Sequence, residues 1–358
     1  MKAPDKYRVI GLMSGTSLDG LDIAYCEYSL KKGSWLFNIL ECTTIRYDSN
    51  WIKKLSSAHA LSGQSLVQLD FDFGMLIGKH CNSFIKQRKI KKVGFIASHG
   101  HTIFHQPQAG FTYQLGNGNA IYSITNIPVV FDFRTLDVVR AGQGAPLVPV
   151  GDHLLFSNYD ACINLGGIAN ISFKMKGERM AFDICFVNMV LNYLADKVEK
   201  RFDKGGRIAA SGKVNRQLLG RLDAVYSKWK RSRPSLGREG FEKYLEPILN
   251  NNEVSVPDCL RTVCESICQE IVQSLPQKKN AKVLVTGGGA YNTFLIARLG
   301  EMVSEGQEVV VPDKSIVEFK EAMVFGFLGV RKVRGEVNVL KSVTGASKNS
   351  IAGTTVGF

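Results

Sequence analysis

A short turn rich in glycine and hydroxyl groups is the part of this sequence best suited to chemistry. It lies between an apolar run at residues 7–13 and an alternating run at residues 21–28, which predicts two strands joined by a tight turn. Glycines let the backbone approach a ligand, and main-chain N–H groups with nearby hydroxyls can surround a phosphate. Carboxylates in the same turn suit a hydrated Mg²⁺, with Asp19 the expected ligand through water. The candidate residues are Ser14, Gly15, Thr16, Ser17, Leu18, Asp19, Gly20 and Asp22. An ordinary hairpin uses the same residue types, so this turn alone leaves both interpretations open.

Two further glycine segments strengthen the phosphate hypothesis. Gly166 and Gly167 lie between two predicted strands, with Asn170 shortly after them. The glycines at 287, 288 and 289 follow an apolar run and precede a predicted helix. Three successive glycines permit a flat base or a ribose to lie against bare backbone, next to a helix N-terminus with partial positive charge. The second and third segments therefore predict a further phosphate loop (Gly166, Gly167, Asn170) and an adenosine loop (Gly287, Gly288, Gly289).

Three histidines form a compact H-x-H-x₃-H pattern at His99, His101 and His105. This spacing permits a zinc site, but no acidic residue or cysteine nearby completes the ligand set. In a strand, alternate residues share a face, so His99 and His101 are expected to project into one cleft. We therefore favour hydrogen bonding of these two side chains to a sugar or a phosphate.

The predicted elements repeat in the two halves of the chain. Strands are expected at 7–13, 21–30, 35–47, 93–98, 113–115 and 129–133, with helices at 51–86 and near Ala120. The second half predicts strands at 161–164, 168–173, 180–185, 282–286 and 308–311, with helices at 187–200, 260–275, from 292 and at 319–331. Each half opens with three strands in tight connection, the first two joined by a glycine turn. Two such α/β modules facing each other could hold a nucleoside triphosphate between their turns. A Gly- and Pro-rich segment at 140–149 is the expected crossover.

Composition and charge limit the function classes. The chain has 358 residues, 45% hydrophobic and 22% charged, which suits a globular enzyme of two domains. No apolar run approaches a membrane span, and polar residues 1–7 predict no signal peptide, so we expect a cytoplasmic protein without membrane partners. The net charge of +13 includes basic clusters at 86–92 and 228–233. Without a nucleic-acid module or an aromatic platform, we interpret this charge as solvated faces and a field that favours anions such as ATP.

The eight cysteines are expected to be buried thiols, with Cys264 and Cys268 on one apolar helix face.

Taken in order along the chain, these segments resemble the anhydro-N-acetylmuramic acid kinase family. The matching stretches are 11–20 (GLMSGTSLDG), 98–102 (SHGHT), 132–134 (DFR), 142–149 (GQGAPLVP), 164–170 (NLGGIAN), 182–183 (FD), 209–213 (AASGK), 287–290 (GGGA) and 321–323 (EAM). The resemblance implies a duplicated RNase H-like fold of the actin/hexokinase type, with an interdomain cleft. The expected domains are 1–133, joined by the tail 341–358, and 134–340, which carries the catalytic Asp and the adenosine loop.

The resemblance also implies an activity and residue roles. Such enzymes use ATP and Mg²⁺, open the 1,6-anhydro ring of anhydro-N-acetylmuramic acid with water and phosphorylate O6, in peptidoglycan recycling. Residues 15–22 and 166–170 would bind the ATP phosphates, and residues 287–290 would contact adenosine. Asp183 would be the general base that activates water. Arg134 and Glu321 would contact the sugar, together with His99 and His101.

The sequence departs from the family pattern after Asp183. The family continues with Thr-Gly-Pro-Gly-Asn, whereas here Ile184-Cys185-Phe186-Val187 precede Asn188. Bulky residues at this turn predict a more apolar wall beside the carboxylate, which could raise its pKa or narrow the sugar pocket. The alternatives are therefore a catalytically impaired nucleotide- or sugar-binding homologue, or a kinase for a related amino sugar. Two smaller departures are His101, where Gln is usual, and Tyr291, where His is usual. A homodimer is the oligomer we consider, although the sequence does not fix the oligomeric state.

Overall fold

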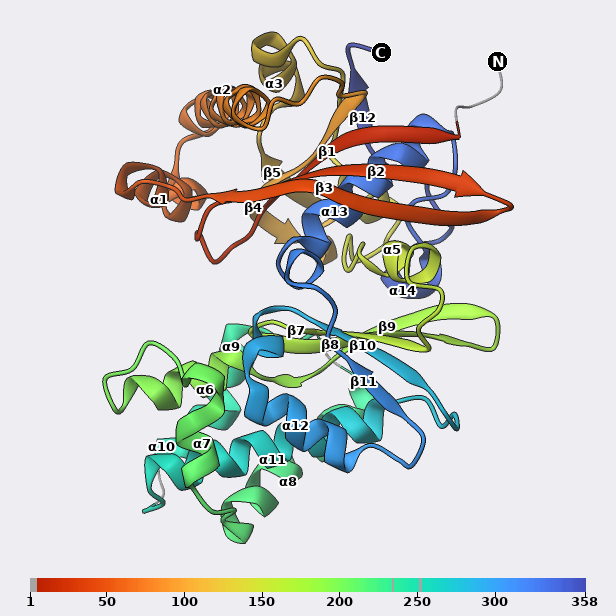
Figure 1. The fold of residues 1–358 in the computed structure, drawn as a ribbon. Helices are drawn as coiled ribbons and strands as arrows, with labels where there is room; N and C mark the ends of the chain where they lie inside the picture. Colours follow the sequence, from red (N-terminus) through yellow and green to blue (C-terminus); the bar gives the residue numbers. More distant parts are fainter. Residues whose placement is uncertain (1–4, 234, 251–252) are drawn as a thin grey trace. The chain divides into compact units, whose positions relative to one another are not determined.

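A computed structural model describes residues 5–233, 235–250 and 253–358. The chain forms two compact units, one running through Leu155 and including Phe319–Phe358, the other comprising Phe156–Glu318. In Figure 1 the first unit carries the red, orange and dark blue ends of the chain, and the second carries its middle. Each unit is described separately below.

The first unit is built on a seven-stranded sheet with the order β12-β6-β4-β1-β2-β3, in which β5 also pairs with β4. Its strands are β1 (Lys6–Ser14), β2 (Leu21–Lys31), β3 (Ser34–Ile45), β4 (Phe95–Gln106), β5 (Phe111–Leu115), β6 (Val129–Phe131) and β12 (Thr354–Val356). Its helices are α1 (Ser49–Ser56), α2 (Gly63–Gln87), α3 (Gly118–Thr125), α4 (Thr135–Val138), α5 (Pro149–Leu154), α14 (Lys341–Thr344) and most of α13 (Lys314–Val333), with 3-10 turns at Ala58–Ala60 and Pro107–Ala109.

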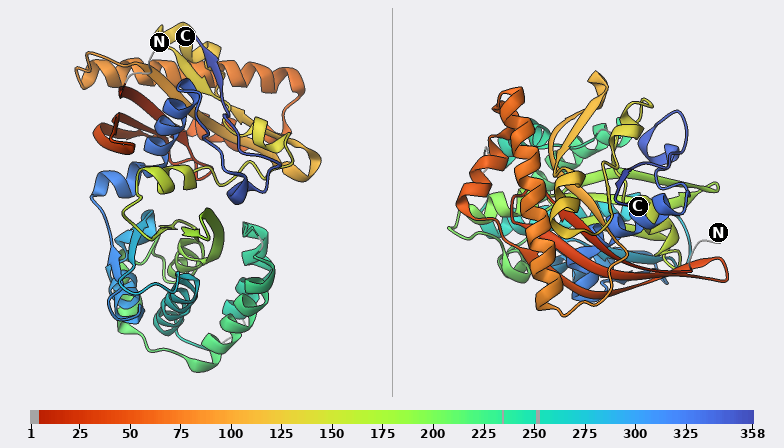
Figure 2. Two further views of the ribbon diagram at one scale, coloured as in Figure 1. Left: turned by 90° about the vertical axis from the view of Figure 1, so that its right-hand side faces the viewer. Right: turned by 90° about the horizontal axis from the view of Figure 1, so that it is seen from above.

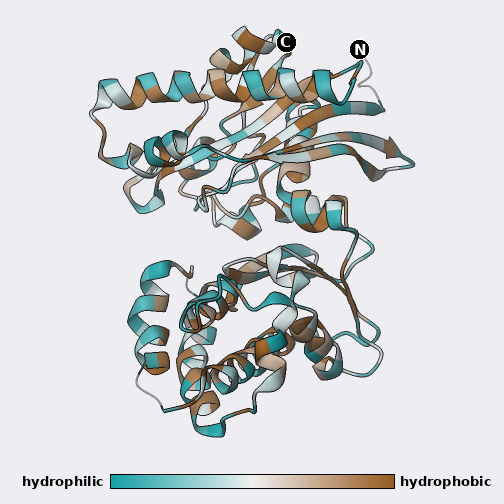
Figure 3. Cartoon of the chain, turned by 60° about the vertical axis from the view of Figure 1, so that its left-hand side comes forward, coloured by the Kyte–Doolittle hydropathy of each residue, from teal (hydrophilic) through white to brown (hydrophobic). Residues whose placement is uncertain are grey.

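Helices cover both faces of this first sheet. On one face, Phe73 and Ile77 of α2 pack against Ile10, Leu12 and Ile23 of the sheet. Figure 3 shows the alternation of hydrophobic and hydrophilic residues along α2 that such one-sided burial requires.

The opposite face carries α13, which crosses β1 at Gly11. A Cβ atom at Gly11 would lie 1.9 Å from the carbonyl oxygen of Ala322, so only glycine permits this contact. Tyr28 of β2 donates a hydrogen bond to the carbonyl oxygen of Met323 at 2.5 Å. These contacts fix α13, and therefore Glu321 upon it, relative to the sheet.

The second unit is built on a five-stranded sheet with the order β11-β10-β7-β8-β9. Its strands are β7 (Ala161–Leu165), β8 (Ile168–Met175), β9 (Glu178–Phe186), β10 (Lys282–Thr286) and β11 (Glu308–Val310). Its helices are α6 (Asn188–Asp196), α7 (Arg207–Ser211), α8 (Arg216–Ser232), α9 (Arg238–Gly240), α10 (Glu246–Asn250), α11 (Val256–Ser274) and α12 (Thr293–Met302), with short turns at Lys204–Gly206, Phe241–Leu245 (a π-helix) and Gly288–Tyr291. Within this unit the helices gather on one side of the sheet (Figures 1 and 2), where Ile163, Ile171 and Val283 of the strands pack against them.

The two sheets share one topology. In each, the first two connections are antiparallel hairpins, and the fourth strand pairs in parallel with the first. On the far side of that fourth strand, β6 in the first sheet and β11 in the second pair with it in parallel. This repetition confirms the duplicated, RNase H-like α/β fold that the sequence predicted.

The predicted domain boundaries differ from the observed units. The sequence analysis places residues 134–155 and 319–340 in the second domain, whereas both segments pack in the first unit. The physical reason is the contact between α13 and β1 at Gly11, which local sequence patterns do not show. The prediction that the tail 341–358 joins the first domain agrees with the pairing of β12 with β6.

Most of the cysteines are buried free thiols, and the basic clusters contain ion pairs. All eight cysteines are free, seven are buried, and burial raises the pKa of the Cys81 and Cys268 thiols to about 12. In the basic clusters, Arg88 pairs with Glu41 at 3.6 Å and Lys230 pairs with buried Glu270 at 2.8 Å. Among the described residues, no helix combines the length and apolar character needed to cross a lipid bilayer.

Candidate active site

The β1–β2 turn of the first unit presents an open tip. The amide of Leu18 donates to the carbonyl oxygen of Gly15 at 3.2 Å, and Thr16, Ser17 and Asp19 are exposed. The nearest atom to a Cβ at Gly15 would be the Ser17 hydroxyl, 3.6 Å away. The turn therefore leaves room for a ligand against its backbone, as expected for phosphate binding.

Ser14 corrects one part of that expectation. Its hydroxyl accepts a hydrogen bond from Tyr47 at 2.8 Å and lies 3.0 Å from Nδ1 of His101, and the residue is buried. The Ser14 side chain therefore supports the turn from below, and only the Thr16 and Ser17 hydroxyls remain free to face a ligand. The sequence places Ser14 in the turn motif but does not reveal its burial under Tyr47, which lies just after the end of β3.

The two predicted histidines lie on opposite faces of the first sheet. The His99 ring lies at a tilt against Phe325 of α13, with 4.6 Å between ring centres, whereas His101 packs edge-on against Phe73 of α2 at 6.3 Å. The expectation of one shared face was wrong because Gly100, at φ +75°, interrupts the alternation of β4. His99 remains a candidate for sugar binding, whereas His101 supports the β1–β2 turn through Ser14. The third histidine, His105, lies 3.2 Å from the Thr112 hydroxyl.

Arg134 is held in place by neutral partners. Its Nε donates to Nε2 of His99 at 2.9 Å, and its Nη1 donates to the carbonyl oxygen of Gly144 at 2.6 Å. Burial and the adjacent guanidinium hold the pKa of His99 well below its usual value, so this imidazole stays uncharged. Burial likewise lowers the pKa of Arg134 to about 10, which still leaves it cationic at neutral pH. Its two hydrogen-bond partners are neutral, whereas the Glu321 and Asp137 carboxylates act on its charge through space and oppose the lowering of its pKa.

Asp137 is a positioning residue that the sequence analysis missed. It is fully buried, and its carboxylate accepts hydrogen bonds from the amide of Gly144 at 2.8 Å and from the Thr344 hydroxyl at 2.8 Å. These bonds aim the Gly144 carbonyl at Arg134. The signal was the adjacency of Asp137 to the 142–149 motif, but its partner Thr344 lies too far along the chain to be inferred.

Glu321 lies close to Arg134 and Asp22 in the first unit. Desolvation by the atoms around it raises the pKa of Glu321. The Arg134 charge acts to lower this pKa, and the Asp22 carboxylate acts to raise it. Asp22 itself accepts a hydrogen bond from the Thr44 hydroxyl at 2.5 Å. The helix segment is anchored next to Glu321, where Lys320 pairs with buried Asp152 at 2.7 Å. The first unit thus brings together Asp22, Arg134 and Glu321, three residues that the sequence singled out separately.

The second unit aligns its predicted residues in a row across three strands. Asn164 of β7 pairs with Asn170 of β8, and Asn170 pairs with Asp183 of β9. Residues directly opposite each other in neighbouring strands share a face of the sheet. The alternate residues Ile163 and Ile171 point to the helical core, so the row lies on the other face.

More hydrogen bonds to carbonyl oxygens fix the β7–β8 turn than fix the β1–β2 turn. The carbonyl oxygens of Gly166 and Gly167 accept hydrogen bonds from the amides of Asn188, Val187 and Met189 at 2.8–3.2 Å. The side chain of Asn188 donates to the Leu165 carbonyl oxygen at 3.2 Å. The turn is therefore fastened to the start of α6, and its amide groups remain as the donors for a phosphate.

Asp183 is half-buried next to the segment that follows α8. One carboxylate oxygen accepts a hydrogen bond from the Leu236 amide at 2.9 Å. Burial raises the pKa of Asp183, and the Leu236 bond partly offsets this rise. A carboxylate with a raised pKa is a stronger base once it is ionised, as water activation requires.

The departure after Asp183 fills the core of the second unit. Ile184, Cys185, Phe186 and Val187 are all buried in that core, and Phe186 packs edge-on against Trp229 and Phe241. The predicted apolar wall is therefore present beside Asp183 only at Ile184, which lines the adjoining cavity.

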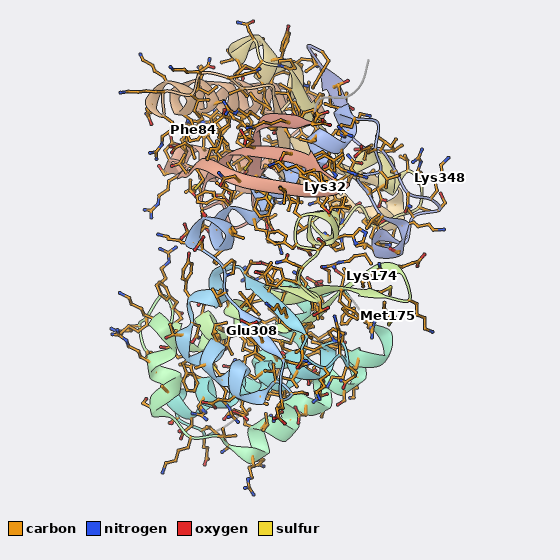
Figure 4. The ribbon with its side chains drawn as sticks, turned by 45° about the vertical axis from the view of Figure 1, so that its right-hand side comes forward. Lys32, Phe84, Lys174, Met175, Glu308 and Lys348 are labelled. Atoms are coloured by element: carbon orange, nitrogen blue, oxygen red, sulfur yellow. The ribbon has the colours of Figure 1, made fainter. Side chains whose placement is uncertain are left out.

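That adjoining cavity has a volume of about 520 Å³ and a mixed lining. Arg233 lies 4.0 Å from the centre of the Phe182 ring, and Lys230 bridges Glu270 and Gln273. Lys174 and Met175, labelled in Figure 4, belong to its lining and are the last residues of β8.

The 287–289 segment borders a larger cavity of about 790 Å³. A Cβ at Gly287 would lie 2.5 Å from Oδ1 of Asn164, and one at Gly289 would lie 2.7 Å from Cβ of Leu165. The glycines therefore pack the segment tightly on the β7–β8 turn, while Gly288 lines the cavity. The cavity wall comprises Asn188, Leu191, Asn192, Arg201, Phe202, Asp203, Lys204, Gly205, Arg207, Gly288, Tyr291, Asn292 and Thr293. The loop 201–207 in this wall was missed by the sequence analysis, because no motif marks it.

The residues present can bind Mg²⁺ only when phosphate oxygens supply part of its coordination shell. Across the described parts of the chain, no three His, Cys, Asp or Glu side chains gather closely enough to hold a metal by themselves. Magnesium bound with a nucleotide needs only one or two carboxylates, because phosphate oxygens and water supply its other ligands. Asp19 at the exposed turn and Asp22 on β2 can supply those carboxylates.

Comparison with known proteins agrees with this geometry. Residues 7–357 match the family model of anhydro-N-acetylmuramic acid kinase. A relative of that name from Francisella tularensis subsp. novicida is 34% identical, covering 96% of this chain and 97% of its own. Another from Sulfurovum sp. is 34% identical, covering 98% and 99%, and one from Sulfurimonas denitrificans is 31% identical, covering 96% and 98%. The chain therefore belongs to the anhydro-N-acetylmuramic acid kinase family and is an ATP-dependent sugar kinase.

Proposed function

We propose that this kinase opens the 1,6-anhydro ring of anhydro-N-acetylmuramic acid with water and transfers the γ-phosphoryl group of ATP to O6. The observation that carries the proposal is the row Asn164–Asn170–Asp183, which joins a glycine phosphate turn to a carboxylate of raised pKa on one face of a sheet. Phosphate binding and proton removal are thereby built into the same unit.

Each unit has its own part in binding the substrates and in proton removal. The second unit binds the nucleotide through the 166–167 turn and the cavity at Gly288, and it supplies the base Asp183. The first unit supplies the β1–β2 turn for phosphates and the group Arg134–Glu321 for the sugar. Arg134 matches the lactyl carboxylate of the substrate, since a guanidinium binds a carboxylate through two parallel donors.

Atoms balance in the proposed reaction as follows. Asp183 removes a proton from a water molecule, whose oxygen forms a bond to C1 of the sugar while the C1–O6 bond breaks. The freed O6 forms a bond to the γ-phosphorus, and the bond from that phosphorus to the β-bridging oxygen breaks to release ADP. The products are N-acetylmuramic acid 6-phosphate, ADP and the proton that Asp183 returns to solvent. Mg²⁺, when bound, offsets charge on the phosphate oxygens.

An isotope experiment tests the ring opening and the transfer together. The protein is incubated with ATP, Mg²⁺ and anhydro-N-acetylmuramic acid in H₂¹⁸O, and ADP release is compared with the mass of the sugar product. We expect one ADP per sugar consumed and one ¹⁸O atom at C1. ADP release independent of the sugar, or a phosphorylated sugar without ¹⁸O, would contradict the proposal.

Family membership favours this function over the two alternatives. A nucleotide-binding homologue without transfer would bind ATP but give no sugar-dependent ADP release. A kinase of a related amino sugar would prefer that sugar in a panel containing N-acetylmuramic acid, N-acetylglucosamine and their 1,6-anhydro forms. We expect the anhydro form of N-acetylmuramic acid to give the highest kcat/KM.

A further inference from the structure

Two large aromatic side chains stand exposed on the wall of the 790 Å³ cavity. Phe202 is 53% exposed and Tyr291 is 45% exposed, although both line the same hollow. Exposed aromatic rings cost solvation free energy, so two of them at one cavity indicate a surface that a ligand covers. Both rings border this one cavity, so a planar group that enters it can contact either ring.

Hydrogen bonds fix the Tyr291 side chain and the backbone next to Phe202. The Tyr291 hydroxyl donates a hydrogen bond to Oε1 of Glu318 at 3.0 Å, which orients its ring. Next to Phe202, the Asp203 carboxylate accepts hydrogen bonds from the amides of Ile208 and Ala209 at 2.9 and 3.0 Å. Phe202 therefore lies in a loop whose backbone is anchored at Asp203.

The loop of Phe202 and the segment of Tyr291 are also fastened to each other. The Thr293 hydroxyl donates to the carbonyl oxygen of Gly205 at 3.1 Å. A Cβ at Gly206 would lie 2.2 Å from Oδ1 of Asn292, so the two backbones approach as closely as glycine allows. These contacts thus set the separation of the two backbone segments before any ligand binds.

The charges around the cavity suit a nucleotide. Arg201, Lys204 and Arg207 come from the Phe202 loop and line the same wall. The Asp203 carboxylate, which accepts the amides of Ile208 and Ala209, offsets only one of these three cations, so the lining remains positive. An apolar, planar group flanked by phosphate matches such a combination of rings and cations.

We propose that Phe202 and Tyr291 are the specificity-determining residues for the base of the nucleotide, which they hold between their ring faces. The ligand class is a purine nucleoside di- or triphosphate, because a purine offers the larger planar area for stacking. The inference rests on the proposed function for the identity of the nucleotide, and its test measures binding as well as turnover.

The experiment replaces the flat ring while keeping an apolar side chain of similar size. Phe202→Leu and Tyr291→Leu are compared with the unmodified protein by calorimetric titration with ADP and by kinetics with ATP. We expect each substitution to raise the Kd for ADP and the KM for ATP about tenfold, with kcat and the KM of the sugar within about twofold. Tyr291→Phe, which keeps the ring and loses only the Glu318 bond, should weaken binding by a smaller factor.

Two controls separate stacking from other effects. Inorganic tripolyphosphate has no base, so its inhibition constant should be the same in all variants. Phe71→Leu removes a ring that is 42% exposed on α2 of the first unit, and it should leave ADP binding unchanged. Phe202→Trp provides a direct signal, since ADP stacked on the indole should quench its fluorescence and tripolyphosphate should not.

The outcomes are distinguishable from failure of the proposed function. If the unmodified protein binds ADP but shows no sugar-dependent turnover, the proposed reaction is wrong and the ADP titrations still test the rings. Unchanged ADP affinity in both leucine variants would overturn the inference. So would an equal weakening of tripolyphosphate and ADP, because that result would place the effect on the phosphates.

Discussion

The turns that open the two modules have the same place in the fold but different chemistry. The β1–β2 turn has an exposed tip with two free hydroxyls and the carboxylate of Asp19, and it is supported by the buried Ser14–His101 contact. The β7–β8 turn consists of two glycines whose carbonyl groups are bound by the start of α6. A duplicated fold thus provides two turns in equivalent places whose surroundings differ, and the proposed function assigns the metal-bound phosphates to the first turn and the nucleotide beside Asp183 to the second.

Changing one carboxylate in each module should give the largest contrast. Asp183→Asn removes the proposed base, so we expect kcat to fall by about 10³-fold with little change in the Kd for ADP. Asp19→Asn should instead raise the Mg²⁺ concentration needed for half-maximal activity, with a smaller loss of kcat. Kinetics at saturating sugar over a range of Mg²⁺ concentrations measure both effects.

The control for this pair is Asp196→Asn, an exposed residue at the end of α6, which should have wild-type kinetics. Full activity of Asp183→Asn would remove this carboxylate from the mechanism. An identical Mg²⁺ dependence of Asp19→Asn and the unmodified protein would move the metal ligand elsewhere.

Glycine-to-alanine changes should show the difference in packing between the turns. A Cβ at Gly20 would lie 2.4 Å from the Ile45 carbonyl oxygen, whereas the nearest atom to one at Gly167 would be the Met189 methyl carbon at 3.8 Å. We expect Gly20→Ala to lower the thermal unfolding midpoint by several degrees, corresponding to about 1–3 kcal/mol. Gly167→Ala should shift it by less than about 2 °C. Equal shifts would show that the two turns tolerate a side chain alike.

Removing the amide that binds Asp183 should shift the pH dependence of catalysis. The Leu236 hydrogen bond lowers the pKa of Asp183 against the rise caused by burial. Leu236→Pro deletes the N–H group, so the pKa should rise further and the acidic limb of kcat/KM should move to higher pH. Leu236→Ala keeps the N–H group and should leave that limb in place.

A proline could also disturb the chain near residue 236. Replacing only the Leu236 amide by an ester, through semisynthesis, deletes the same donor without constraining φ. The ester variant should reproduce the shift of the acidic limb. A limb unmoved in both variants would show that this bond does not set the protonation of Asp183.

The smallest expected effect concerns nucleic acid. The basic clusters contain ion pairs, Arg88 with Glu41 and Lys230 with Glu270, which reduce the charge available to a phosphate backbone. We expect no binding of duplex or single-stranded DNA at about 150 mM salt. Salt-sensitive binding at this ionic strength, measured by fluorescence anisotropy, would assign these clusters to a nucleic-acid partner and not to a field for small anions.

Local sequence was sufficient for the elements and for the residue types of the site. Alternating and apolar runs predicted the main strands, and glycine-rich turns after strands predicted the ligand loops, because both depend on backbone geometry within a few residues. The region 204–250 was not predicted in detail, and it contains α7–α10. Helix propensity there is interrupted by glycine and proline, and α7 and α8 pack against α11, far along the chain.

What the sequence determined by itself is the family and a set of candidate groups: two glycine turns predicted to bind phosphate, a segment predicted to contact adenosine, the acid Asp183 and the pair Arg134 and Glu321. The tertiary structure decided which of these groups meet. It separated His99 from His101 through the positive φ of Gly100, buried Ser14 under Tyr47, and placed α13 with the first unit. The physical reason is that strand alternation and turn formation are local, whereas burial, face and partner depend on contacts between residues far apart in the chain.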